Sequence, residues 1–153
     1  MRSIERGRRA AAAALAACLI GGAAGWPNRS AAEGALAVGL PADVAKDGFA
    51  FGYALEKSSP EEARAAALAD CRAESPGVDK RAQALCAPAG SFRNKCFAVA
   101  MDPKDATPGV GWAIAPNLRA ATRGALAKCV ATAGADRPGA CKVTHAKCDG
   151  AAK

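Results

Sequence analysis

The feature that most constrains this 153-residue chain is a unit that occurs twice. Residues 67–71 (ALADC) are matched by residues 125–129 (ALAKC), and each stretch ends a predicted helix. A Gly-aromatic-Ala segment precedes each helix, and a further cysteine, Cys86 or Cys141, follows it. The two stretches lie 58 residues apart, so the sequence predicts an internally duplicated fold.

Each unit is predicted to contain two strands, a helix and a third strand. Alternating large and small residues predict strands over residues 35–40, 49–56, 96–102, 110–115 and 141–148. Helices are expected over residues 60–72 and 118–130, where Ser59 and Asn117 can cap the first turns. The structure of residues 73–95 is left open, because Pro88 and Gly90 favour either an edge strand or a loop.

These elements predict an α+β fold, with residues 33–153 forming one domain of two repeats, about 35–95 and 96–149. One mainly antiparallel sheet is expected, with both helices on the face that holds the large side chains. The opposite face is then smooth and apolar, and it is either an interaction face or is covered by residues 73–95. Its predicted members are Gly52, Ala54, Ala98, Ala100, Gly111 and Ala113.

The first 32 residues are predicted to be a secretory signal peptide. Residues 1–9 are basic, residues 10–25 are apolar or small, and small residues precede a cleavage point near Ala32. An alternative is lipidation of Cys18, because residues 15–18 (LAAC) resemble a bacterial lipobox. No segment is expected to span a membrane, and both routes end in the periplasm or the medium, where disulfides persist.

The net charge of +7 does not indicate a nucleic-acid-binding protein. Five arginines and one glutamate precede Glu33, so residues 33–153 keep a net charge of about +3. The remaining basic residues are scattered among acidic ones, as on an ordinary solvated surface.

Six cysteines remain after the signal peptide, and the repeat narrows their 15 possible pairings. A cysteine at a helix end and a cysteine at the following strand start can link neighbouring elements in each unit. The last two cysteines then pair with each other and are expected to join the two halves. The predicted disulfides are Cys71–Cys86, Cys129–Cys141 and Cys96–Cys148.

These motifs resemble the bacterial domain-of-unknown-function 4189 family. The resemblance rests on residues 96–100 (CFAVA), 111–113 (GWA), 125–129 (ALAKC) and 141–143 (CKV), and it covers roughly residues 35–149. The first unit departs from the pattern, because residues 86–88 (CAP) replace the Cys-basic-Val start of the third strand. The resemblance implies a secreted protein with no assigned reaction and no catalytic residues to transfer.

Few residues invite a catalytic interpretation. His145 is the single histidine, and no serine nucleophile motif accompanies it. A metal site with Cys141 and Cys148 is not expected, because a strand directs them to opposite faces and oxidised cysteines do not bind zinc. Tyr53 and Trp112 occupy equivalent places and are interpreted as core residues rather than as a ligand platform. No catalytic residue, cofactor or metal is predicted.

The expected function is that of an exported, disulfide-stabilised module without enzymatic activity. It would bind an unidentified protein or envelope component of a bacterium, and an anchor through Cys18 is the lipidated alternative. The second functional hypothesis is an envelope hydrolase or a thiol-redox protein. The sequence indicates neither the ligand nor the oligomeric state.

Overall fold

The structure is a computed structural model that describes residues 32–73, 78–137 and 139–153. The predicted signal peptide, apart from Ala32, and the predicted lipidation residue Cys18 lie outside these residues. The elements are β1 (Glu33–Gly39), α1 (Val44–Asp47), β2 (Ala50–Lys57), α2 (Pro60–Arg72), α3 (Lys80–Ala84), β3 (Ala87–Phe92), β4 (Cys96–Met101), β5 (Val110–Ala115), α4 (Leu118–Ala133) and β6 (Lys142–Cys148).

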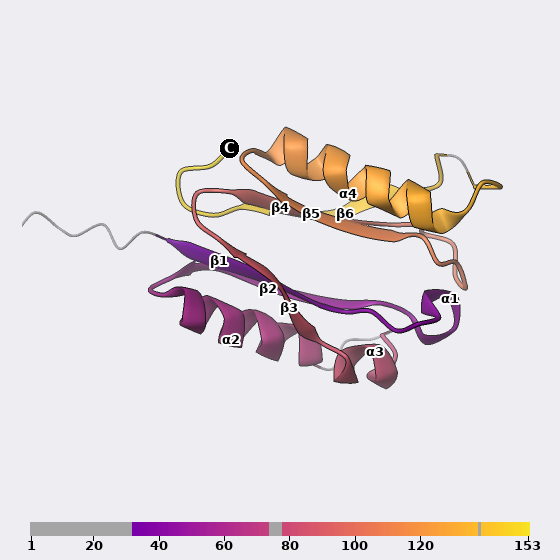
Figure 1. The fold of residues 1–153 in the computed structure, drawn as a ribbon, viewed down its shortest axis with the longest axis horizontal. Helices are drawn as coiled ribbons and strands as arrows, with labels where there is room; N and C mark the ends of the chain where they lie inside the picture. Colours follow the sequence, from indigo (N-terminus) through magenta and orange to yellow (C-terminus); the bar gives the residue numbers. More distant parts are fainter. Residues whose placement is uncertain (1–31, 74–77, 138) are drawn as a thin grey trace, which may run out of the picture.

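The fold is α+β, as predicted, but the strands form two antiparallel sheets rather than one. The first sheet has the strand order β2-β1-β3 and the second has the order β5-β4-β6. The two orders are equivalent under the repeat, because in each unit the first strand lies between the second and the third. Four layers result, with α2 and α4 outside and the two sheets between them (Figure 1).

The large side chains of both sheets face each other and form the central core. Rings meet across the layer, with centroids 4.9 Å apart for Tyr53 and Phe97 and 5.8 Å apart for Phe49 and Trp112. The buried members of this core are Leu36, Val38, Phe49, Phe92, Phe97, Val99 and Val110. Because each sheet has only three strands, pairing the large faces of two sheets removes more apolar area from water than one helix could.

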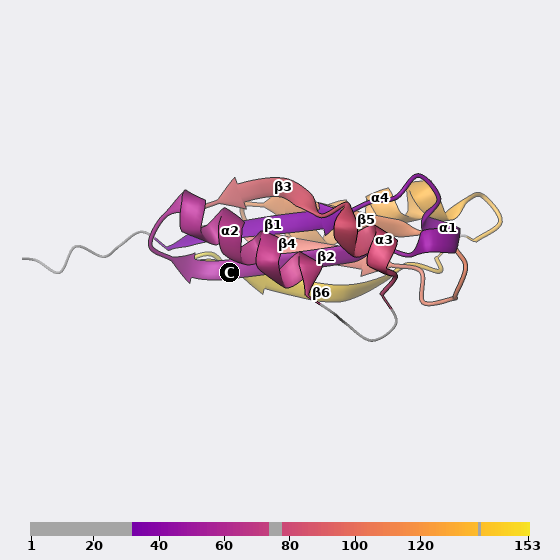
Figure 2. The same ribbon diagram turned by 90° about the horizontal axis from the view of Figure 1, so that it is seen from below.

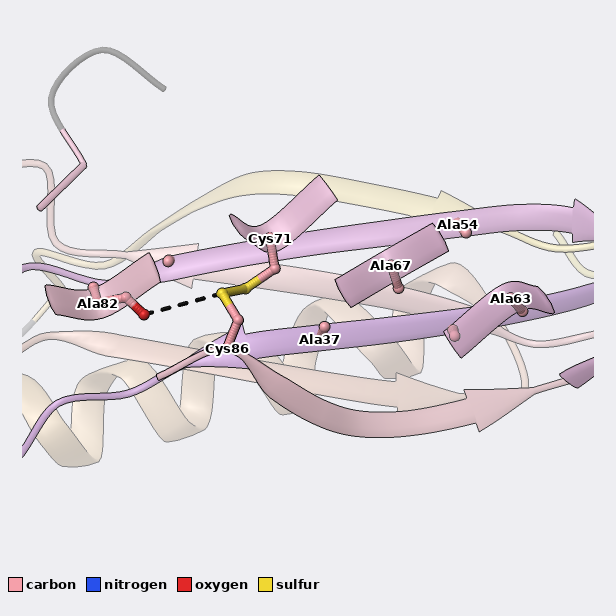
Figure 3. Packing of buried hydrophobic residues seen from close by; sticks show 9 residues of the cluster. Ala37, Ala54, Ala63, Ala67, Cys71, Ala82 and Cys86 are labelled. Carbon is pink, nitrogen blue, oxygen red and sulfur yellow. Dashed lines mark hydrogen bonds between the residues drawn. A yellow bond between two sulfur atoms is a disulfide. The ribbon is translucent and has the colours of Figure 1, made fainter. Parts of the chain in front are cut away.

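The helices cover the small faces, which corrects the prediction that they lie on the large ones. In the first unit, α2 places Ala63, Ala67 and Cys71 against the sheet (Figure 3). Gly52 and Gly111 lie directly under the helix backbones. A Cβ atom on Gly52 would lie 2.1 Å from the backbone nitrogen of Cys71, so only glycine allows this approach.

The predicted interaction face is therefore wrong. All six of its residues lie between a sheet and a helix: Gly52, Ala54, Ala98, Ala100, Gly111 and Ala113. Of the two covers, α2 and α4 hide these six residues, whereas α3, within the alternative cover of residues 73–95, hides only the adjoining end of the same face at Gly39. Alanine and glycine are needed there because they let an alanine-rich helix approach the sheet closely.

The three disulfides are confirmed as Cys71–Cys86, Cys129–Cys141 and Cys96–Cys148. The prediction that the third one joins the two halves is wrong, because Cys96 and Cys148 are paired neighbours on β4 and β6 of the second sheet. A β-bulge explains why Cys148 shares the helix side with Cys141: the register shifts between Val99 and Ala100, which exchanges the two faces of β6.

The register shows how closely the units correspond. Ala37 pairs with Gly52 in the first sheet, and Ala100 pairs with Gly111 in the second. The third strand of each unit is bulged at the matching point. In β3 the bulge lies opposite Leu36 and Ala37 of β1, and in β6 it lies opposite Val99 and Ala100 of β4. These matches make Glu33 and Arg93 of the first unit the counterparts of Cys96 and Cys148.

The segment that the sequence left open contains two elements. Asp79 caps the short helix α3, and β3 follows as an edge strand paired with β1, in accord with one of the two alternatives. The segment between β1 and β2 contains one helical turn, α1, which Asp43 caps. No helix in the described ranges is long and apolar enough to cross a membrane.

Candidate binding cleft

The two sheets leave the molecule two long sides, which we call flanks. On one side β2 and β6 are the edge strands, and on the other β3 and β5 are (Figure 2). We call these the β2/β6 flank and the β3/β5 flank. The candidate site is a cleft of about 360 Å³ on the β2/β6 flank. Pockets for small organic ligands begin at about 300 Å³.

Aromatic side chains from both sheets form much of the cleft wall. Phe49, directly before β2, and Phe51, in β2, are stacked with ring centroids 6.0 Å apart. His145 of β6 meets the ring of Phe51 edge-on at 4.8 Å and that of Tyr53 at 6.4 Å. Because residues two apart on a strand share a face, Phe51 and Tyr53 reach the cleft together.

The position of His145 follows from the bulge in β6. Without the bulge, His145 would share a face with Val143, which packs in the helix-side core of the second unit. The shifted register pairs His145 with Val99 and turns it toward the first sheet instead. The sequence identified His145 as the single histidine but not its aromatic neighbours.

Two polar side chains at the cleft are held by backbone contacts. Asp70, in the last turn of α2, accepts a hydrogen bond from the backbone N–H of Tyr53 at 2.9 Å. This bond satisfies a donor at the edge of β2 and fixes the carboxylate at the edge strand, where it lines the cleft together with Tyr53. Gln83, 7% exposed, donates from its side-chain nitrogen to the carbonyl of Ala73 at 2.7 Å.

The disulfide nearest the cleft fixes its helical wall. Cys71 lines the cleft directly after Asp70, and its bond to Cys86 ties the end of α2 to the start of β3. Of the cleft-lining residues that the structure describes, Asp70 is the only aspartate, glutamate, lysine or arginine. The cleft therefore combines ring surfaces with one fixed carboxylate.

Two other hollows are less suited to bind a ligand. One of about 520 Å³ lies between α1 and the β4–β5 loop, and its buried acid Asp102 is already paired with Arg137. Hydrogen bonds from Arg137 lower the pKa of Asp102 to about 2, so this carboxylate is held in a structural pair. The other, about 720 Å³, is a shallow surface at the start of α4 beside Arg119 and Arg123.

The predicted chemical residues lie apart from one another. Cys141 and Cys148, the neighbours of His145 in the rejected metal motif, belong to different disulfides. Within the described residues, no three of His, Cys, Asp and Glu gather as metal ligands would. Tyr53 and Trp112 both pack in the core between the sheets, as interpreted, and Tyr53 also lines the cleft.

The fold and its disulfides define a class: a duplicated, disulfide-linked α+β protein with two sheets packed face to face. A family model described as a domain of unknown function (DUF4189) matches residues 33–148. The chain belongs to this family, which confirms the resemblance seen in the sequence. Searches of curated proteins and of solved structures returned no match.

Proposed function

We propose that this protein is a non-catalytic binding module that works in the periplasm or the medium of a bacterium, and that the β2/β6 cleft is its binding site. The observation that supports the site most directly is the convergence of three aromatic rings and His145 on one hollow of ligand size. Rings offer large contact areas with few rotatable bonds, so they bind ligands at low entropic cost.

The disulfides support the proposed compartment. Three disulfides link residues whose separations in sequence range from 12 to 52, and disulfides persist in oxidising compartments. Intact mass of the exported protein, with and without reduction and alkylation, tests this part. We expect a start near Glu33 and three disulfides. A lipid on Cys18 would make the protein membrane-anchored. Disulfides that are reduced under mild conditions would favour the redox alternative.

Binding at the cleft can be tested without knowing the ligand. A library of small, soluble organic fragments is titrated into the oxidised, isotope-labelled protein, and backbone amide shifts are recorded. We expect the responding amides to cluster around Phe51, Tyr53, Asp70 and His145. Hits that gather elsewhere, or an absence of hits at millimolar fragment concentration, would overturn the proposed site.

A matched pair of variants controls the fragment experiment. Phe51→Ala removes a ring from the cleft wall, and we expect it to abolish the responses there. Val130→Ala removes an exposed apolar side chain from α4, in the other unit, and should leave the responses unchanged. An equal loss in both variants would show that the responses do not report on the cleft.

A further inference from the structure

The aromatic wall of the cleft has an electrostatic preference. The face of an aromatic ring is negative and attracts a cation placed within about 6 Å of the ring centroid. Phe51 and Tyr53 are half-buried at this hollow, whereas the buried Phe49 ring is stacked on those of Phe51 and Trp112 and supports the wall from behind. An anionic ligand would meet these ring faces unfavourably, whereas a neutral or cationic ligand would not.

The single carboxylate adds to this preference. Asp70 lies at the cleft with its side chain fixed by the backbone N–H of Tyr53, and no lysine or arginine is among the described lining residues. A cation in the cleft would approach both the carboxylate and the Tyr53 ring. Two independent features of the cleft therefore favour positive charge.

The second unit contains a cation–ring contact at the position that corresponds to Tyr53. Trp112 is the counterpart of Tyr53, because Trp112 pairs with Val99 as Tyr53 pairs with Leu36. Lys128, which precedes Cys129, places its ammonium group 5.8 Å from the Trp112 ring centroid.

The corresponding helix position in the first unit is Asp70, which precedes Cys71. The tryptophan thus has a cation from its own chain, whereas the helix residue at the tyrosine is a carboxylate bound to the tyrosine backbone N–H, and no cation of the described residues lies over the tyrosine ring.

We propose that the β2/β6 cleft binds a small organic cation with an apolar body, of the quaternary-ammonium class. This inference rests on the proposed function and specifies the ligand chemistry of the same site. The cation lies against the Tyr53 ring as Lys128 lies against Trp112, and Asp70 supplies the counter-charge. The volume of about 360 Å³ suits a small molecule rather than a segment of a macromolecule.

The test compares two soluble probes of nearly the same shape, of which one is positively charged and the other is neutral. Choline has a charged trimethylammonium group, and 3,3-dimethyl-1-butanol replaces its nitrogen by carbon. Each is titrated into the oxidised protein while amide shifts of the cleft residues are followed. We expect choline to bind at the cleft about tenfold more tightly than the alcohol.

Asp70→Asn removes the charge while an amide oxygen can still accept from Tyr53. We expect it to weaken choline binding about fivefold and to leave the alcohol unchanged. Glu61→Gln is the matched control, because it removes one charge from the first turn of the same helix. Equal effects of the two substitutions on choline would overturn the role of Asp70.

The outcomes separate the two proposals. Equal affinity of choline and the alcohol at the cleft would overturn the cation inference and leave the binding site standing. Binding of neither probe, combined with fragments that do not respond at the cleft, would overturn the proposed function as well. The probe comparison uses the unsubstituted protein, so it does not depend on how the variants fold.

Discussion

In the first unit Gly52 lies under the backbone of α2, and in the second Gly111 lies under that of α4 at the matching register. Both units also share the strand order, the bulge in the third strand and a disulfide from the helix end to the next strand. These common features are the ones that close packing of helix on sheet requires. The halves differ at positions where the packing of helix on sheet does not determine the residue type.

The differences gather at the flanks and at the strand ends. His145 on the β2/β6 flank corresponds to Gly90 on the β3/β5 flank, since each lies opposite the matching residue of the central strand. A Cβ atom on Gly90 would lie 2.8 Å from the Ile114 side chain, so there is no room there for a ring. One flank is filled by its neighbours, whereas the other keeps an aromatic cleft.

The largest expected difference between the halves concerns the contact that links the beginning of the first strand to the end of the third strand in each unit. The second unit has the Cys96–Cys148 disulfide where the first has the Glu33–Arg93 ion pair. Replacing both cysteines by alanine should cost about 4 kcal/mol of unfolding free energy, because the bond closes a loop of 52 residues. Urea unfolding measures this loss.

The matched variant replaces Glu33 and Arg93 by glutamine. Glu33 is buried, but the Arg93 side chain is 57% exposed and the double replacement leaves neither charge unpaired, so the loss should be about 1 kcal/mol or less. If both double variants lowered the free energy of unfolding by the same amount, the disulfide and the ion pair would stabilise their units equally, which would contradict this prediction.

The next prediction concerns the shared framework, where the halves should respond alike. Gly52→Ala would place a methyl group 2.1 Å from the backbone of α2, and Gly111→Ala would place one 2.4 Å from the backbone of α4. Each should cost about 2–3 kcal/mol by overpacking. Gly90→Ala is the control: its nearest neighbour is the tip of a side chain, which can move, so we expect a loss below about 1 kcal/mol.

Most of the framework could be predicted from the sequence because it depends on local patterns. The strands of the second unit, both main helices and all three disulfides follow from alternation, caps and cysteine spacing. Ser59 illustrates this, since its side chain accepts from the backbone of Glu62 at the expected helix start.

What the sequence did not reveal depends on how the elements meet. Alternation separates a large face from a small face in each strand, but it does not say which one a helix covers. Here the second sheet, not the helices, provides the partner for the large face. The bulge in β6 was equally hidden, because a register shift arises from the pairing of two strands and leaves no mark in either alone. The position of His145 in the cleft depends on that shift.

The third prediction uses a residue that one half has and the other lacks. Asp102 occupies the place of Gly39, and its pair with Arg137 lowers the pKa of the carboxylate to about 2. A lowered pKa in the folded state stabilises the protein above the ordinary pKa of 3.8, and this stabilisation is lost as the pH falls toward 2. The stability difference between the unsubstituted protein and Asp102→Asn should therefore be constant above about pH 4 and should shrink between pH 4 and 2.

Urea midpoints at several pH values check this expectation. Only the difference between the two proteins is informative, because it isolates the contribution of Asp102. Asp105→Asn serves as the control, because Asp105 is exposed in the same loop. A difference that does not change with pH would mean that Asp102 stabilises the fold by its shape and hydrogen bonds alone.

The smallest effect on stability is expected at the flank where the halves differ most. His145→Ala removes one edge-on contact with the Phe51 ring and should cost about 0.5–1.5 kcal/mol. The same change removes a wall of the cleft, so fragment responses at Phe51 and Tyr53 should fall several-fold although the fold is kept. Lys142→Ala, at the exposed start of the same strand, should change neither quantity. Unaltered fragment responses in His145→Ala would mean that His145, which occupies the position of Gly90 in the other unit, only packs between the sheets. The two flanks would then differ in shape without differing in function.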